Sequence, residues 1–212
     1  MSLNERFLVP RPQGVVQAMR ASADDPRRRL LLALLCGGWN GPIKIPEIAR
    51  WAGLTDLHVV GTMLFRMQRD EWLDGDAKPL KVPEGAVSTV VPELLHHLSS
   101  SGRGVLCTEE GLVYARVGMP RRTAEEIAVL SAGLRPLVRR VSQSVIDEGK
   151  DDGACAWGLM SAVDRVQLFV MPLQFGKRLF YLALGATPHL EVIQLVQLVA
   201  VLGIRYERER IK

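Results

Sequence analysis

Cysteine is scarce in this sequence, and its placement excludes two classes of small stabilised fold. The chain of 212 residues has three cysteines, Cys36, Cys107 and Cys155, which are far apart and form no CxxC pair. An odd number of isolated cysteines predicts neither a disulfide framework nor a zinc ribbon. We expect all three to behave as small apolar side chains in a reducing compartment.

Long hydrophobic runs are also missing. The longest apolar stretches cover residues 30–36 and 190–204, and Glu191, Gln194 and Gln197 interrupt the second. Neither stretch is long and apolar enough to span a bilayer. Residues 1–12 include two prolines but no apolar h-region, so we expect no signal peptide. The sequence therefore predicts a cytoplasmic protein without membrane insertion.

Catalytic signatures are absent as well. The sequence has no GxxxxGK[ST], GxSxG or HExxH motif, and no GxGxxG between a predicted strand and helix. His96 and His97 are adjacent on a predicted helix, where they diverge by about 100° and suit one metal ion poorly. Acidic pairs such as those at 109–110 and 125–126 fall in turns or at helix starts, where solvation explains them. We predict no enzymatic activity, no metal and no cofactor.

The composition that is present is that of an ordinary globular protein. Hydrophobic residues make up 48% and charged residues 24%, with a formal net charge of +4. Residues 1–90 carry 12 basic and 10 acidic side chains, and residues 91–212 carry 15 and 13, so each half is +2. A dedicated nucleic-acid-binding protein usually concentrates its positive charge in one domain. The even distribution argues against that class.

The first half is predicted to contain an irregular leader at 1–23 and a small helical domain at 24–85. The first helix is predicted to start near Asp24-Asp25-Pro26, since an aspartate cap followed by proline is a typical start signal. A short helix covers 47–52, and Thr55 is expected to cap a third that ends near Asp70. The last residues are predicted as a turn at 72–76 and a returning strand at 81–82.

These elements resemble the winged-helix form of the helix-turn-helix fold. Small or apolar residues are needed where two helices approach around a tight turn. The residues that carry the resemblance are Ile45, Ile48, Ala49, Gly53 and Leu54, followed by Leu64, Trp72 and Leu73. A recognition helix reads bases from its N-terminal turns, and Asp56 at that position would repel phosphates. A protein-binding role is therefore favoured over DNA reading.

Residues 90–206 form a second predicted domain with the order α-β-β-α-β-β-β-α, followed by a charged tail at 207–212. Strands are expected at 103–108, 112–117, 154–162, 165–172 and 177–184. The long helix is predicted to start at Thr123, with Glu126 completing a capping box, and to have its apolar residues at helical spacing. Those residues are Ile127, Leu130, Leu134, Leu137, Val138 and Val141. The closing helix at 188–202 is apolar on most sides, so it must be covered by its own sheet, by the first helix or by another chain.

The second domain resembles the roadblock/LC7 (longin-related) family. The matching segments are the hairpin GVLCTEEGLVYA at 104–115, the long helix from Glu125 to Leu137, and the last strands at 166–173 and 179–184. The resemblance implies an α+β fold with one antiparallel five-stranded sheet and no catalysis. It also implies homodimers formed through the long central helix and the third strand. Family members bind or regulate small Ras-like GTPases, or are scaffold subunits of larger assemblies.

Two groups of arginines are the candidate contact residues. A solvated helix face is the ordinary explanation for each group, and an acidic partner surface is the functional one. The candidate partner surface consists of Arg121, Arg122, Arg135, Arg139 and Arg140. The candidate contact for nucleic acid or an acidic partner consists of Arg27, Arg28 and Arg29.

The sequence thus predicts a non-catalytic, dimeric scaffold or regulator that acts through protein–protein contacts. Its predicted partners are a second copy of itself, through the second domain, and a small Ras-like GTPase. The alternative is a transcriptional regulator, with a DNA-binding winged helix and a roadblock-like domain for dimerisation or sensing. DNA is the disfavoured partner of the two.

Overall fold

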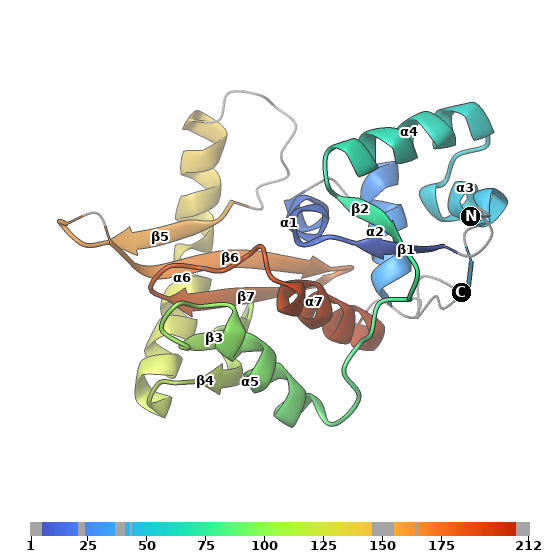
Figure 1. Ribbon diagram of the computed structural model, residues 1–212. Helices are drawn as coiled ribbons and strands as arrows, with labels where there is room; N and C mark the ends of the chain where they lie inside the picture. Colours follow the sequence, from blue (N-terminus) through green and yellow to red (C-terminus); the bar gives the residue numbers. More distant parts are fainter. Residues whose placement is uncertain are drawn as a thin grey trace.

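The computed structural model describes residues 6–20, 24–36, 41–42, 44–145, 155–163 and 165–206. The predicted charged tail at 207–212 lies outside these residues. An N-terminal lobe of helices with a two-stranded sheet packs beside a C-terminal lobe, in which helices flank a five-stranded sheet (Figure 1).

The N-terminal lobe consists of four helices framed by two short strands. In chain order these are β1 (Phe7–Pro10), α1 (Pro12–Arg20), α2 (Pro26–Cys36), α3 (Ile45–Ala52), α4 (Leu57–Arg69) and β2 (Leu73–Asp76). The two strands pair antiparallel, with Phe7 opposite Asp76 and Pro10 opposite Leu73. The strand pair therefore joins the beginning of the lobe to its end.

The prediction of an irregular leader at 1–23 is wrong, because β1 and α1 lie within it. Two prolines suggested irregular backbone, but Pro12 is the first residue of α1, where its missing N–H costs no hydrogen bond. Val15, Ala18 and Met19 follow at helical spacing and are buried in the core.

The predicted turn at 72–76 and the returning strand at 81–82, which would form the wing of a winged helix, are also corrected. Residues 73–76 are the strand β2 rather than part of a turn, and the described chain has no strand at 81–82. The partner of β2 is β1, which is far away in sequence, and its backbone hydrogen bonds are satisfied there. The winged-helix interpretation of this lobe is therefore not confirmed.

The ends of the two helices in the predicted turn are set by local chemistry. Gly53 ends α3 in the left-handed conformation (φ 70°) and donates its backbone N–H to the carbonyls of Ala49 and Arg50. The cap of α4 is Asp56 and not Thr55 as predicted. Its carboxylate accepts from the backbone N–H groups of His58 and Val59, and a negative charge also suits a helix N-terminus.

The predicted element order of the second half is confirmed. It consists of α5 (Val87–His97), β3 (Gly104–Thr108), β4 (Val113–Val117), α6 (Arg121–Val145), β5 (Trp157–Met160), β6 (Val166–Phe175), β7 (Arg178–Gly185) and α7 (Ile193–Tyr206). The five strands form one antiparallel sheet in the order β4-β3-β7-β6-β5. The chain is therefore a mixed helix and sheet protein with the predicted sheet.

The predicted capping box of the long helix is not formed. Because α6 begins at Arg121, Thr123 lies inside its first turn. Glu125 and Glu126 instead accept from Arg121 and Arg122, one turn earlier in the helix.

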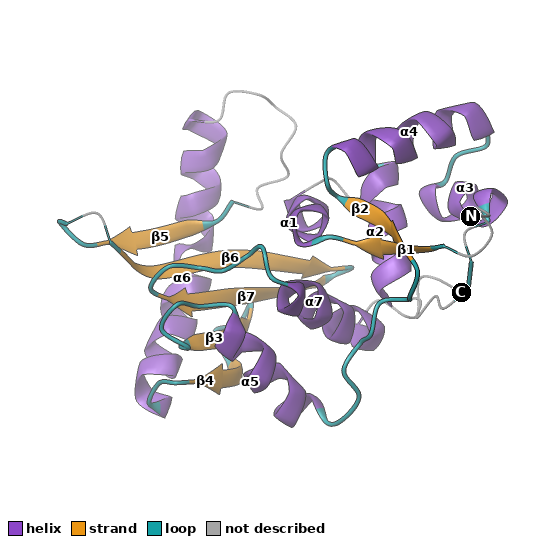
Figure 2. Ribbon diagram, viewed as in Figure 1, coloured by secondary structure: helices purple, strands orange, loops and turns teal. Residues whose placement is uncertain are grey.

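Helices cover both faces of the five-stranded sheet, with α6 on one face and α5 and α7 on the other (Figure 2). Successive residues of β7 alternate between the two faces, as in any strand. Leu179, Tyr181 and Ala183 pack in the core under α6, whereas Phe180, Leu182 and Leu184 belong to the larger core under α5 and α7.

The larger core continues without a break into the N-terminal lobe. Helix α7 packs on α5 and β6 and also on α1 and α2. The approach to α2 is so close that a Cβ at Gly203 would overlap the Sγ of Cys36. The cover that the apolar sequence of α7 requires therefore comes partly from the N-terminal lobe.

Candidate protein-interaction surface

Helix α6 is longer than the sheet that it covers. Its 25 residues extend about 37 Å, whereas five strands span roughly 19 Å from the first to the last. In Figure 1 the helix crosses behind the sheet, and its C-terminal end extends past β5. Part of α6 is therefore left without a sheet beneath it.

The inner face of α6 is built from small residues. Ala124, Ala128 and Ser131 are fully buried against the sheet. The Ser131 hydroxyl donates to the carbonyl of Ile127, so no polar group is left unpaired by this burial. The turn between β3 and β4 also approaches closely, because a Cβ at Gly111 (φ 82°) would lie 3.3 Å from the Cα of Val129. Small residues thus bring the first half of α6 into tight contact.

A second face of α6 carries large apolar side chains that the described chain leaves partly uncovered. We call this set the apolar stripe, and it consists of Leu130, Leu134, Leu137 and Val141. Their spacing confines them to about 60° of the helix surface. Leu137 is 53% and Val141 51% exposed. Four apolar side chains in a row on one exposed face are typical of a helix that packs against a partner.

The edge strand β5 adds further exposed apolar surface. It ends the order of the sheet and pairs only with β6 among the described residues. Leu159, Met160 and Val163 are 50%, 63% and 74% exposed along this part of the chain. An open strand edge with apolar side chains is a template for pairing with another chain.

The five arginines of the predicted partner surface do not form one patch. Helical spacing places Arg121, Arg135 and Arg139 on one side of α6 and Arg122 and Arg140 on another, and neither side is that of the apolar stripe. Three of the five form exposed ion pairs, which are Arg121–Glu125 (2.7 Å), Arg122–Glu126 (3.1 Å) and Arg135–Glu109 (3.1 Å). Their charges are therefore partly compensated within the chain.

The arginines at the start of α2 also point in different directions. Arg28 is buried, and its Nη2 donates to the carbonyl of Gln174 on β6 (3.2 Å). Arg27 pairs with Asp25 (2.6 Å), and Arg29 pairs with Asp24 (2.8 Å). Arg28 thus links the two lobes, and the structure does not bring the three side chains together as one exposed basic cluster.

Buried ionisable groups under α6 are held in their neutral forms. Burial raises the pKa of the Cys107 thiol to about 12, against smaller opposing effects of hydrogen bonds to Ser131 and the Tyr181 backbone. Burial likewise raises the pKa of Tyr181 to about 12. A neutral, buried thiol is a poor nucleophile. Within the described ranges, no three His, Cys, Asp or Glu side chains are close enough to hold a metal ion.

None of the described helices combines the length and the apolar character needed to cross a membrane.

The apolar stripe was not identified from sequence, because the leucines of α6 have the same spacing as core leucines. The usable signal lay in the small residues Ala124, Ala128 and Ser131, which form their own row at helical spacing. A helix with a small-residue row and a separate leucine row has two packing faces. Among the described residues, the five-stranded sheet covers only the small-residue face.

Several solved structures match part of the chain, whereas no family model and no curated protein matches it. A roadblock/LC7 domain from Streptomyces avermitilis is 17% identical, covers 57% of this chain and 96% of its own, and has a TM-score of 0.40. MglB from Myxococcus xanthus is 14% identical over 58% of this chain and 92% of its own, with a TM-score of 0.36. The gliding protein MglB from Thermus thermophilus is 15% identical, covers 62% of this chain and 98% of its own, and has a TM-score of 0.36. At these values the three structures assign no role to any residue of this chain.

Proposed function

We propose that this protein is a non-catalytic, dimeric scaffold or regulator that acts through protein–protein contacts. The observation that carries the proposal is the apolar stripe of α6, which the described chain leaves partly uncovered. A single exposed apolar residue would be ordinary, but a row of four on one helix, in a domain that also has an open apolar strand edge, is not.

A second copy of the chain is the simplest cover for this surface. A twofold interface is self-complementary, so a stripe on one copy meets the same stripe on the other. The open edges of two β5 strands could pair at the same time, since each has unpaired backbone groups along one side. This arrangement is also what the resemblance to the roadblock/LC7 family implies.

A small Ras-like GTPase is the proposed further partner. Support for this class comes from the resemblance of residues 90–206 to the roadblock/LC7 family, whose members bind or regulate small Ras-like GTPases. Binding should therefore be measured with a Ras-like GTPase in its GDP form and with a non-hydrolysable GTP analogue, and a regulator should prefer one of the two.

The oligomeric state tests the main proposal. Size-exclusion chromatography with light scattering should show a dimer at micromolar concentration. The double variant Leu130→Glu/Leu137→Glu should be monomeric, because four charges would be buried in a twofold interface. Val129→Glu is the matched control, since Val129 is 65% exposed on the same helix but lies outside the stripe. A monomeric wild-type protein, or a dimer that persists in the double variant, would remove the support for the proposal.

The DNA-binding alternative has less support. Exposed apolar side chains of α4 (Leu57, Val59 and Phe65) occupy the helix that would have to enter a groove. Asp56 caps its N-terminus with a negative charge, and Arg28 is buried. Binding to random duplex DNA at 50 mM salt, weakening as salt rises, would favour this alternative over the scaffold.

A further inference from the structure

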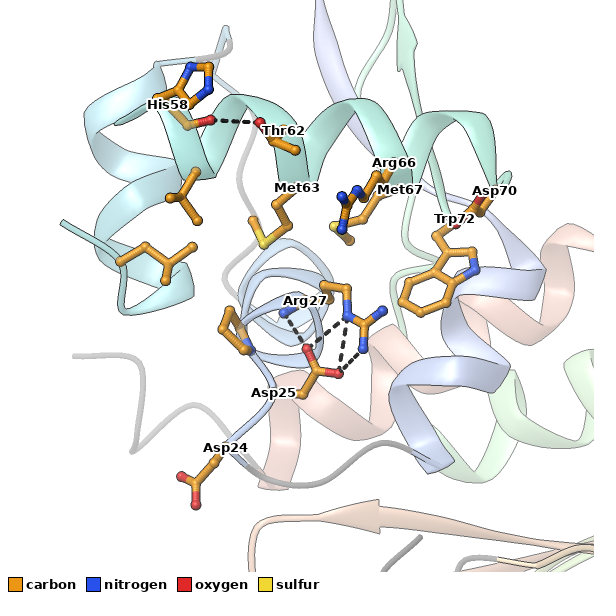
Figure 3. A pocket seen from close by; sticks show the side chains of 13 residues that line it. Asp24, Asp25, Arg27, His58, Thr62, Met63, Arg66, Met67, Asp70 and Trp72 are labelled. Atoms are coloured by element: carbon orange, nitrogen blue, oxygen red, sulfur yellow. Dashed lines mark hydrogen bonds and ion pairs between the residues drawn. The ribbon is translucent and has the colours of Figure 1, made fainter. Parts of the chain in front are cut away.

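The N-terminal lobe contains a pocket that the proposed function does not use. It lies between the start of α2 and one side of α4, and its volume is about 760 Å³. The floor is formed mainly by apolar side chains, which are Leu54, Val59, Met63, Met67 and Trp72. Figure 3 shows the two methionines and the indole on the α4 side of this space. Pockets of roughly 300–1,000 Å³ with apolar walls and a few polar groups are typical sites for small molecules.

All but one of the charged side chains that line the pocket are in ion pairs. Three carboxylates line it, and each is paired with an arginine: Asp24 with Arg29 (2.8 Å), Asp25 with Arg27 (2.6 Å) and Asp70 with Arg69 (2.9 Å). Arg66 lines the same pocket and has no ion pair with any described residue. Three carboxylates and two guanidiniums thus line the pocket, and Arg66 is the one of these five without an ion pair in the described chain.

A second guanidinium is fixed next to this charge. Arg27 binds Asp25 through its Nε and Nη2 and lies over the ring of Trp72, 4.9 Å from its centroid. These contacts leave its Nη1 without a hydrogen bond to the described part of the chain. In Figure 3 the guanidinium groups of Arg27 and Arg66 face the same space, beside the indole of Trp72. Two guanidiniums around an apolar cavity favour an anionic group between them.

We propose that this pocket binds a small anionic amphiphile, in which a carboxylate or sulfonate group is attached to a flat apolar body. The anionic group would lie between Arg66 and Arg27, and the apolar body would pack on Met63, Met67 and Trp72. This site is on a different lobe from the apolar stripe, so it does not depend on the proposed dimer. It adds a ligand-binding function to the N-terminal lobe.

Two fluorescent probes test the proposal in the full-length chain. Anilinonaphthalene sulfonate has the required anion and apolar body, and N-phenyl-1-naphthylamine has the same body without the sulfonate. Arg66→Met should weaken binding of the sulfonate probe about tenfold, because a charge-assisted contact is lost, and should leave the neutral probe unchanged. Arg66→Lys should retain most of the affinity for the sulfonate, since it retains the charge.

Arg50→Met is the matched control, because Arg50 is an exposed arginine at the end of α3 that neither lines the pocket nor pairs with a carboxylate that does. Probe bound elsewhere on the protein, including at the apolar stripe, is common to both variants and cancels in their comparison. Thr62→Trp, which fills the pocket from an exposed position on α4, should reduce binding of both probes. Equal affinity of the sulfonate probe for Arg66→Met and Arg50→Met, or unchanged binding to Thr62→Trp, would overturn the proposal.

Discussion

Two long helices cover opposite faces of the same sheet, and they differ in how their apolar surfaces are covered. In α7 the residues Leu195, Leu198 and Leu202 are fully buried among α5, the sheet and the N-terminal lobe. In α6 the fully buried residues are small, and the leucines are exposed or half-buried. An apolar helix face must be covered, but its sequence does not say whether the cover comes from the same chain.

The N-terminal lobe accounts for the difference. Helix α2 lies against α7 at Gly203, and Arg28 of α2 reaches the backbone of β6. No described element occupies the corresponding position over the apolar stripe of α6. By this comparison, the N-terminal lobe covers α7 in the way that we propose a second copy covers α6.

The largest difference in stability is expected between leucine-to-alanine substitutions in α7 and in α6. Leu198→Ala should lower the free energy of unfolding by about 2–5 kcal/mol at every protein concentration, since it leaves a cavity in the core. Leu137→Ala should change the stability of the monomer by no more than about 0.5 kcal/mol, because the side chain is half exposed.

Urea denaturation over a range of protein concentrations distinguishes the two effects. The cost of Leu137→Ala should appear only at concentrations where the wild-type protein is dimeric, because assembly adds to stability by mass action. A concentration-independent cost equal to that of Leu198→Ala would mean that the stripe packs within its own chain, and the contrast between α6 and α7 would not hold.

Local patterns explain how much of the fold could be predicted. The order of elements in residues 90–206 follows from alternation and helical spacing, which depend on neighbours in sequence. The β1–β2 pair could not be predicted this way, since its hydrogen bonds join the two ends of the lobe. The prolines at 10 and 12 also concealed α1, because proline favours both irregular backbone and the first turn of a helix.

The candidate sites depend on tertiary contacts, and this limited their prediction. Arg27, Arg28 and Arg29 are adjacent in sequence, but each helical residue turns by about 100°, so one points into the protein while its neighbours remain exposed. The pocket beside Arg66 exists only because α2 and α4 are brought together by packing. No spacing within either helix indicates it.

A smaller effect is expected where α2 and α7 approach each other most closely. Gly203→Ala should destabilise the protein by about 1–3 kcal/mol, because the added methyl group overlaps the Sγ of Cys36. In a Cys36→Ala background the same change should cost little, since the Sγ is gone and the Cys36 Cβ would lie 3.5 Å away. A double-mutant cycle of urea midpoints measures this coupling. Equal costs in both backgrounds would show that the lobes are not in contact here.

The smallest expected effect on stability is a pH dependence that comes from Cys107, which is buried in the face of the sheet under α6. The pKa of its thiol is raised from the ordinary 9.0 to about 12 by burial, so the folded state holds the proton more tightly than the unfolded state. This contribution to stability is complete below pH 9 and is lost as the pH rises through about 12. Between pH 8 and pH 10, ionisation of the unfolded thiol should therefore cost about 1 kcal/mol.

Cys107→Ala isolates this contribution from other alkaline effects. The variant should be less stable at pH 8 because of the atoms removed, but its free energy of unfolding should fall about 1 kcal/mol less than that of the wild type between pH 8 and pH 10. Tyr181, whose pKa is also raised to about 12, is present in both proteins, and its contribution is lost mainly above pH 10. Parallel pH profiles for the two proteins would mean that the thiol is accessible to solvent, and that the small residues of α6 do not seal this face of the sheet.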